Sequence, residues 1–153
     1  MVTAIPTITL NNGVEMPQVG FGVFQVPNQE TTDAVRSALK AGYRSIDTAA
    51  IYGNEEGVGK ALAESGIARE ELFITSKVWI ADMGYEQTLE AFDASLRRLG
   101  LDYLDLFLIH WPAPEKDLYV ETWKALEKLY AENKVRAIGV SNFQPDHLDK
   151  LIA

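Results

Sequence analysis

The sequence predicts an α/β fold of the TIM (β/α)8-barrel type, incomplete, with about five βα units after an N-terminal β-hairpin. Short apolar runs recur about every 30 residues after the first gap, which is the size of a βαβ unit. They begin near Val19, Arg44, Leu72, Leu104 and Val135. Stretches with helical periodicity lie between the runs. This alternation predicts a parallel sheet with right-handed crossovers.

The segment Thr7–Met16 is predicted to form the hairpin. Its Asn12-Gly13 dipeptide lies between two short runs in which apolar residues alternate. Asn-Gly is a strong signal for a hairpin. A plain surface turn is the alternative that these residues leave open.

The predicted helices are marked by their apolar stripes and by the glycines that end them. Gly42, Gly66 and Gly100 each stand where a helix favours a left-handed residue after its last turn. Each glycine is followed within a few residues by the next apolar run. The stripes, at spacings of three and four, are Val35, Ala38 and Leu39; Leu89, Phe92, Leu96 and Leu99; and Val120, Trp123, Leu126 and Tyr130.

A last helix is expected from Pro145, because proline suits the first helical turn. Leu148, Leu151 and Ile152 begin an apolar stripe, and Ala153 ends the chain within it. A complete barrel of this type typically has about 250 residues. We therefore expect residues 1–153 to be the N-terminal part of a single barrel domain, truncated so that strands six to eight are absent.

An open, doubly wound sheet is the competing architecture, and it usually carries a glycine-rich nucleotide motif after its first strand. In Gly20–Gly22 the third glycine of that motif is missing. Gly57–Lys60 resembles a phosphate-binding loop, but Asn54 stands in place of its first glycine and Ala61 in place of Ser or Thr. Neither nucleotide motif is complete, which favours the barrel.

Polar side chains follow the second to fifth predicted strands, and barrels of this type build their active sites at those strand ends. The residues are Asp47, Lys77, His110, Ser141 and Asn142, with Tyr52 in the loop just after Asp47. Taken singly, they have ordinary explanations, such as a helix cap, a solvated lysine, a core histidine or a packed tyrosine. Their convergence on one face predicts a functional site.

These residue types suit the reduction of a carbonyl group. A tyrosine hydroxyl, with a pKa near ~10, is a weak acid, but the ammonium of Lys77 would favour its ionised form. Asp47 would hold Lys77 in place and charged. His110 would donate a hydrogen bond to an oxygen that becomes negative during reaction. Tyr52 is then the proton donor, and a nicotinamide must supply the hydride.

Three aromatic residues follow strands one, three and four, namely Phe24, Trp79 and Trp111. They would form the walls of a largely apolar substrate pocket. Ordinary packing at the rim of the barrel is the alternative.

Composition excludes several other classes of protein. The net charge is −8 with no block of Lys or Arg, which argues against nucleic-acid binding. No stretch approaches the ~18 apolar residues of a membrane span, and Met1–Asn12 does not resemble a secretory signal. Without cysteine there is no disulfide or thiolate chemistry, and two histidines without paired spacing predict no metal site. We expect a cytoplasmic protein.

Three motifs resemble the aldo-keto reductase family. Gly42–Ala49, followed by Tyr52–Glu55, is similar to the family's first signature. Ile138–Phe143 is similar to a second signature, and Ile109–Pro112 matches another run of the family. In style the chain resembles the bacterial branch that includes diketo-gluconate reductases.

The resemblance implies NADPH-dependent reduction of aldehydes or ketones to alcohols, with a small carbonyl compound as substrate. Tyr52 corresponds to the family's general acid. Lys77 and Asp47 correspond to the residues that tune it, and His110 to the residue that orients the carbonyl.

The resemblance also implies the cofactor contacts. Ser141 and Asn142 correspond to residues that hold the nicotinamide amide, and Gly22 and Val23 to backbone positions that line the cofactor, together with Asp47. The hairpin corresponds to a plug over the bottom of the barrel. The family's third signature, whose basic residues bind the adenosine 2′-phosphate and pyrophosphate, belongs to the absent part. NADH instead of NADPH remains open.

Two alternatives to a reductase remain. The first is a non-catalytic half-barrel that self-associates, because five parallel strands leave two open edges and uncovered apolar faces. The other is a regulatory member of the fold that binds cofactor without turnover. A full-length parent is expected to be a monomer.

Overall fold

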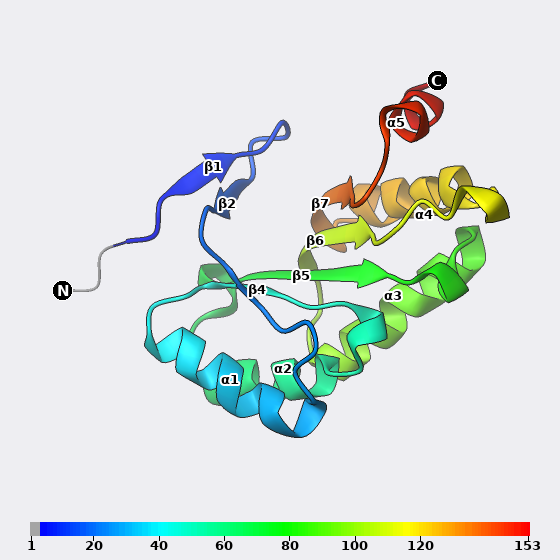
Figure 1. Cartoon of the computed structure of the whole chain (residues 1–153). Helices are drawn as coiled ribbons and strands as arrows, with labels where there is room; N and C mark the ends of the chain where they lie inside the picture. Colours follow the sequence, from blue (N-terminus) through cyan, green and yellow to red (C-terminus); the bar gives the residue numbers. More distant parts are fainter. Residues whose placement is uncertain (1–3) are drawn as a thin grey trace.

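The structure, a computed structural model, describes residues 4–153. The prediction that Met1–Asn12 is no secretory signal therefore falls partly outside the described residues. The chain opens with a hairpin, in which β1 (Thr7–Thr9) and β2 (Glu15–Pro17) pair antiparallel. Its turn contains Gly13, with a φ of +87°. The predicted hairpin is thus confirmed, and Figure 1 shows it away from the layer of helices.

A five-stranded parallel sheet follows, with the strand order β3-β4-β5-β6-β7. Its strands are β3 (Phe21–Gly22), β4 (Ser45–Asp47), β5 (Phe73–Val78), β6 (Leu104–Ile109) and β7 (Val135–Val140). The spatial order equals the order along the chain, whereas a doubly wound sheet reverses direction at a switch point. The incomplete barrel is therefore confirmed, and within residues 4–153 β3 and β7 are its edges.

Helices cover one face of the sheet, and α1 to α4 lie along it in sequence order (Figure 1). The helices are α1 (Asn28–Lys40), α2 (Glu55–Glu64), α3 (Tyr85–Leu99), α4 (Tyr119–Ala131) and α5 (Pro145–Ile152), of which α5 lies beyond β7 (Figure 1). Single 3-10 turns are η1 (Ala50–Tyr52), η2 (Arg69–Glu71), η3 (Ile80–Asp82) and η4 (Pro114–Lys116). Gly42, Gly66 and Gly100 all have positive φ, as predicted for residues that end a helix.

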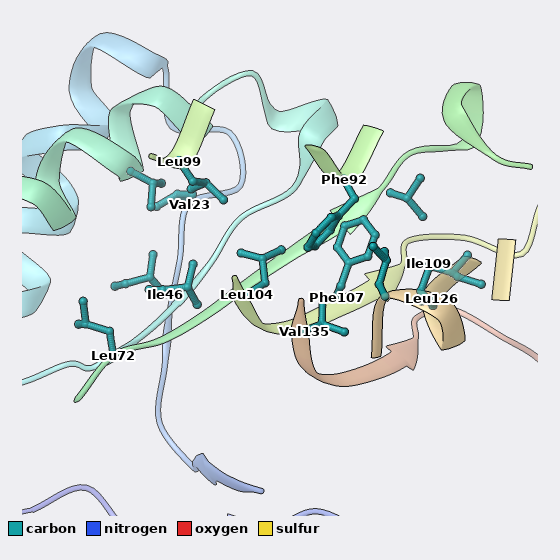
Figure 2. Packing of buried hydrophobic residues seen from close by; sticks show 14 of the residues in the cluster. Val23, Ile46, Leu72, Phe92, Leu99, Leu104, Phe107, Ile109, Leu126 and Val135 are labelled. Atoms are coloured by element: carbon teal, nitrogen blue, oxygen red, sulfur yellow. The ribbon is translucent and has the colours of Figure 1, made fainter. Parts of the chain in front are cut away.

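The main core lies between the sheet and these helices (Figure 2). Phe92 of α3 meets Phe107 of β6 edge to face, with ring centroids 5.1 Å apart. Both side chains are almost completely buried, and burying one large apolar side chain stabilises a fold by about 1.5–3 kcal/mol.

A smaller apolar cluster lies on the other face of the sheet. Phe73, Leu106 and Ala137 pack there against Leu10 and Met16 of the hairpin segment. Phe73 is the first residue of β5, so the hairpin covers the face near the starts of the strands. This leaves the opposite ends of the strands open for a site.

The glycines that resembled a phosphate loop lie inside α2 and serve helix packing. A methyl group at Gly59 would stand 2.4 Å from the carbonyl oxygen of Leu99 in the α3 segment. At Gly57 it would stand 2.8 Å from the carbonyl oxygen of Asn28 in α1. Only glycine lets three helices approach so closely.

None of the helices in the described part of the chain is both long and apolar enough to cross a membrane.

Candidate active site

The register of the sheet brings the predicted polar residues together at the carboxyl-terminal ends of the strands. Asp47 ends β4 and pairs with Thr75 in β5, and Lys77 of β5 pairs with Leu108 in β6. Alternate residues of a strand share a face, so Lys77 lies on the same face as Thr75, two residues nearer the end of β5. His110 follows β6 directly.

Lys77 is the centre of this group. Its side chain is only 8% exposed, and Nζ lies 2.6 Å from Oδ1 of Asp47. Nζ also donates to the backbone oxygen of Thr48 at 3.1 Å and lies 3.5 Å from the hydroxyl oxygen of Tyr52. Lys77 therefore does not extend into solvent. Asp47 is 43% exposed and pairs with Lys77 rather than capping a helix.

Tyr52 is the last residue of η1, and the left-handed Gly53 turns the chain away directly after it. Its ring lies edge to face with the ring of His110, with centroids 5.8 Å apart. The ring of Phe24 lies 5.2 Å away by the same measure. The Tyr52 hydroxyl thus lies near the ammonium of Lys77, and the Tyr52 ring packs against the rings of His110 and Phe24.

The surroundings of His110 favour its neutral form. Burial lowers its pKa, and the nearby ammonium of Lys77 lowers it further, against a smaller opposing effect of Asp47. Its Nδ1 is buried and has no hydrogen-bond partner within residues 4–153. A buried N–H without a partner costs more than a buried lone pair, so we assign the proton to Nε2.

A cleft of about 510 Å³ opens beside these groups. Its wall is mostly aromatic and apolar and consists of Phe24, Gln25, Ile51, Tyr52, Trp79, His110 and Trp111. The three aromatic residues predicted for a substrate pocket all line it. Gln25 and Ile51 were not predicted. Ile51 could have been predicted from its position between Asp47 and Tyr52. Gln25 could not, because nothing in the sequence indicates its left-handed φ of +64°.

The residues predicted to hold a nicotinamide lie on the two outer strands, with Gly22 and Val23 at the end of β3 and Ser141 and Asn142 directly after β7. Asn142, with a φ of +63°, donates from Nδ2 to the backbone oxygen of His110 at 2.9 Å and to Oγ of Ser141 at 3.1 Å. These bonds use the amide nitrogen and leave the Asn142 side-chain oxygen as a possible acceptor. Val23 is buried, and its backbone N–H and C=O are bonded to Asp47 and Asn54, so it offers no free polar group.

The donor and acceptor set fits a nicotinamide. A methyl group placed on Gly22 would meet no described atom within 4 Å, so the backbone at the end of β3 is open on that side. The hydroxyl of Ser141 and the side-chain oxygen of Asn142 suit a carboxamide, which both donates and accepts. Across residues 4–153, no three His, Cys, Asp or Glu side chains are grouped to hold a metal ion.

Comparison with known proteins gives consistent matches. The model of the aldo/keto reductase family matches residues 18–152. Glyoxal reductase of Bacillus subtilis (strain 168) is 67% identical over 147 residues, which are 95% of this chain and 52% of that protein. The chain thus spans about half the length of the curated relatives it matches.

Two solved structures show the same architecture. An aldo/keto reductase from Brucella melitensis superposes with a TM-score of 0.96 at 59% identity, covering 99% of this chain and 58% of that one. A mutant of Gox0644 in complex with NADPH superposes with a TM-score of 0.92 at 47% identity, covering 98% and 54%. The finer placement near diketo-gluconate reductases stays a prediction.

Proposed function

The chain belongs to the aldo/keto reductase family, and we propose on that premise that the protein reduces small aldehydes and ketones to alcohols with NADPH. One observation carries the proposal. The ammonium of Lys77 lies 2.6 Å from a carboxylate oxygen of Asp47 and 3.5 Å from the hydroxyl of Tyr52, at the wall of an aromatic cleft. The similar structure with bound NADPH supports the choice of cofactor.

Tyr52 is the general acid in this proposal. When bound, NADPH supplies the hydride to the carbonyl carbon. The carbonyl oxygen becomes an alkoxide, and the Tyr52 hydroxyl transfers its proton to it. The phenolate that remains faces the ammonium of Lys77, which favours the ionised form. Asp47 keeps that ammonium in place, and solvent returns the proton to Tyr52.

His110 orients the substrate. Its Nε2–H donates a hydrogen bond to the carbonyl oxygen, and the bond strengthens as negative charge develops there. The lowered pKa of His110 keeps the imidazole neutral. A neutral histidine donates this bond without competing with Tyr52 as the acid.

Ser141 and Asn142 hold the nicotinamide amide in this proposal, and the backbone at Gly22 lies against its ring. The half-exposed Asp47 borders the same space, while the fully buried Val23 supports the backbone beside Gly22 from below the surface. A cleft of about 510 Å³ with mostly apolar walls suits a small carbonyl compound. The similarity to glyoxal reductase supports a reactive aldehyde such as glyoxal as the first compound to test.

The test is the oxidation of NADPH in the presence of glyoxal, followed by absorbance. Tyr52→Phe is expected to lower kcat by a factor of about 10²–10⁴, because that is the contribution of a positioned general acid. Tyr43→Phe, which removes a hydroxyl outside the cleft, is the matched control and should retain activity. Full activity in Tyr52→Phe would exclude the assigned role.

One observation favours a second candidate, a self-associating half-barrel. Within residues 4–153 β7 is an open edge, and Ile152 of α5 is 82% exposed. Sedimentation of the 153-residue chain separates the two candidates. A dimer that binds NADPH without turnover supports the second, and a monomer excludes it. NADPH binding by an inactive monomer would instead support a regulatory member of the fold.

A further inference from the structure

Asn54 belongs to the motif Tyr52–Glu55 and has no role in the chemistry described above. It is 0% exposed and stands directly before α2, where an asparagine ordinarily caps the helix with its own side chain. Here its side chain makes no capping bond. Its polar atoms are directed instead to residues outside α2.

The side-chain amide of Asn54 makes three hydrogen bonds, all to residues outside α2. Nδ2 donates to the backbone oxygens of Val23 at 2.9 Å and Val26 at 3.0 Å. Oδ1 accepts from the hydroxyl of Thr48 at 2.7 Å. An isosteric aspartate would offer no donor to the two carbonyls, so the amide is the group that this place requires.

The first two bonds hold the segment Val23–Val26, which carries Phe24 and Gln25 of the cleft wall. Phe24 is 65% exposed, so burial contributes little to its position. Gln25 has a φ of +64°, a strained value for a residue with a side chain. Such strain persists only where the surroundings hold it, and here the two carbonyls on either side of Phe24 and Gln25 are bonded to one amide.

The third bond leads to Lys77. The hydroxyl of Thr48 bonds to Asn54, while the backbone oxygen of the same residue accepts from Nζ of Lys77 at 3.1 Å. Asn54 also follows Tyr52 by two residues, across the left-handed Gly53. One buried amide therefore connects the wall at Phe24 with both groups of the proposed proton donor.

We propose that Asn54 is a positioning residue that holds the Phe24 wall in register with the Tyr52–Lys77 pair. This inference rests on the proposed reductase function for its kinetic consequence. Its structural part, the attachment of Val23–Val26, is independent of turnover.

The experiment combines two measurements on Asn54→Ala and on Thr48→Val, a milder change that keeps shape and removes the hydroxyl. With glyoxal and NADPH, KM for glyoxal should rise about fivefold to tenfold, the size expected for a lost hydrogen bond, with a smaller change in kcat. Exchange of the Val26 amide, which donates to Val23, should accelerate about tenfold. Thr48→Ser keeps the hydroxyl and should retain the KM of the parent.

Ser95→Ala is the control for a merely structural effect. It removes a buried bond to Glu55, the neighbour of Asn54, on the side of α3. This variant should lose stability without a change in KM. A similar rise of KM in Ser95→Ala, or an unchanged KM in both Asn54→Ala and Thr48→Val, would overturn the proposal.

Absence of turnover in the unmodified protein would contradict the proposed function and not this inference. The Val26 exchange rate then decides alone. Faster exchange in Asn54→Ala and Thr48→Val but not in Thr48→Ser supports the attachment, and equal rates in all three refute it.

Discussion

Asp105 and Asp47 both pair with basic side chains, but they lie at different ends of the strands and in different surroundings. Asp105, second in β6, is 0% exposed and accepts from the backbone N–H of Ile74 at 2.8 Å, while Arg69 and Arg136 reach it at 2.8 and 3.0 Å. Asp47, at the end of β4, is 43% exposed and forms an ion pair with the buried Lys77.

The difference separates a structural ion pair from a chemically available one. The carboxylate of Asp105 is fully buried and bonded to Ile74, Arg69 and Arg136, so it is not accessible to a ligand. At Asp47 the buried partner is the cation, and that cation faces a hydroxyl at the wall of a cleft. A charge that is held on one side and open on the other can stabilise a charge that forms during a reaction.

Of the two pairs, the one at Asp47 should have the larger effect on turnover when its cation, Lys77, is removed. Lys77→Met should lower kcat for glyoxal reduction by a factor on the order of 10², because the Tyr52 phenolate loses its stabilising charge. The free energy of unfolding should change by less than about 1 kcal/mol, since the half-exposed Asp47 stays hydrated. Kinetics and urea denaturation measure the two quantities. A strongly destabilised variant with normal kcat would reverse the comparison.

Removing the buried charge of Asp105 should instead lower stability and leave turnover unchanged. Asp105→Asn should lower the free energy of unfolding by about 3 kcal/mol, as expected when one partner of a buried ion pair is lost. Urea denaturation at neutral pH checks this value. The KM for glyoxal and the kcat should remain those of the parent. A loss of turnover without a loss of stability would show that the Asp105 cluster acts on the site.

The smallest expected effect is a pH dependence from His110. Its pKa is lowered in the folded protein, whereas in the unfolded chain it is near ~6.5. The unfolded chain therefore binds the proton first as the pH falls. His110 has no effect on stability above about pH 6.5 and reduces it below that value.

His110→Gln removes this titration. Its melting temperature should fall less between pH 7.5 and pH 5.5 than that of the parent, by about one or two degrees at most for a fraction of a kcal/mol. Equal falls in both proteins would show that His110 does not titrate differently in the two states.

Much of this arrangement follows from local patterns in the chain. Apolar runs and helical stripes predict the order of strands and helices, and Pro145 and Gly100 mark a helix start and a helix end. Because parallel strands place their carboxyl ends together, Asp47, Lys77 and His110 could be expected at one edge. The short distances among Asp47, Tyr52 and Lys77 agree with that expectation, while their roles stay predictions.

Other features have no local pattern. Asp105 is one acidic residue in an apolar strand, and nothing nearby in the sequence indicates the two arginines that reach it. Gly57 and Gly59 resembled a phosphate loop because a sequence motif does not show which helices approach each other. Asn54 is an ordinary helix cap by its position, and only its distant partners show otherwise.

The sequence by itself determined the elements, their order and the edge of the sheet that carries the polar residues, because hydrophobic periodicity and glycine conformations act over a few residues. Tertiary structure alone decided which atoms meet: the second partner of Lys77 at Thr48, the buried Nδ1 of His110 and the three bonds of Asn54. Those contacts join residues up to about thirty positions apart, and their geometry depends on how whole helices and strands pack.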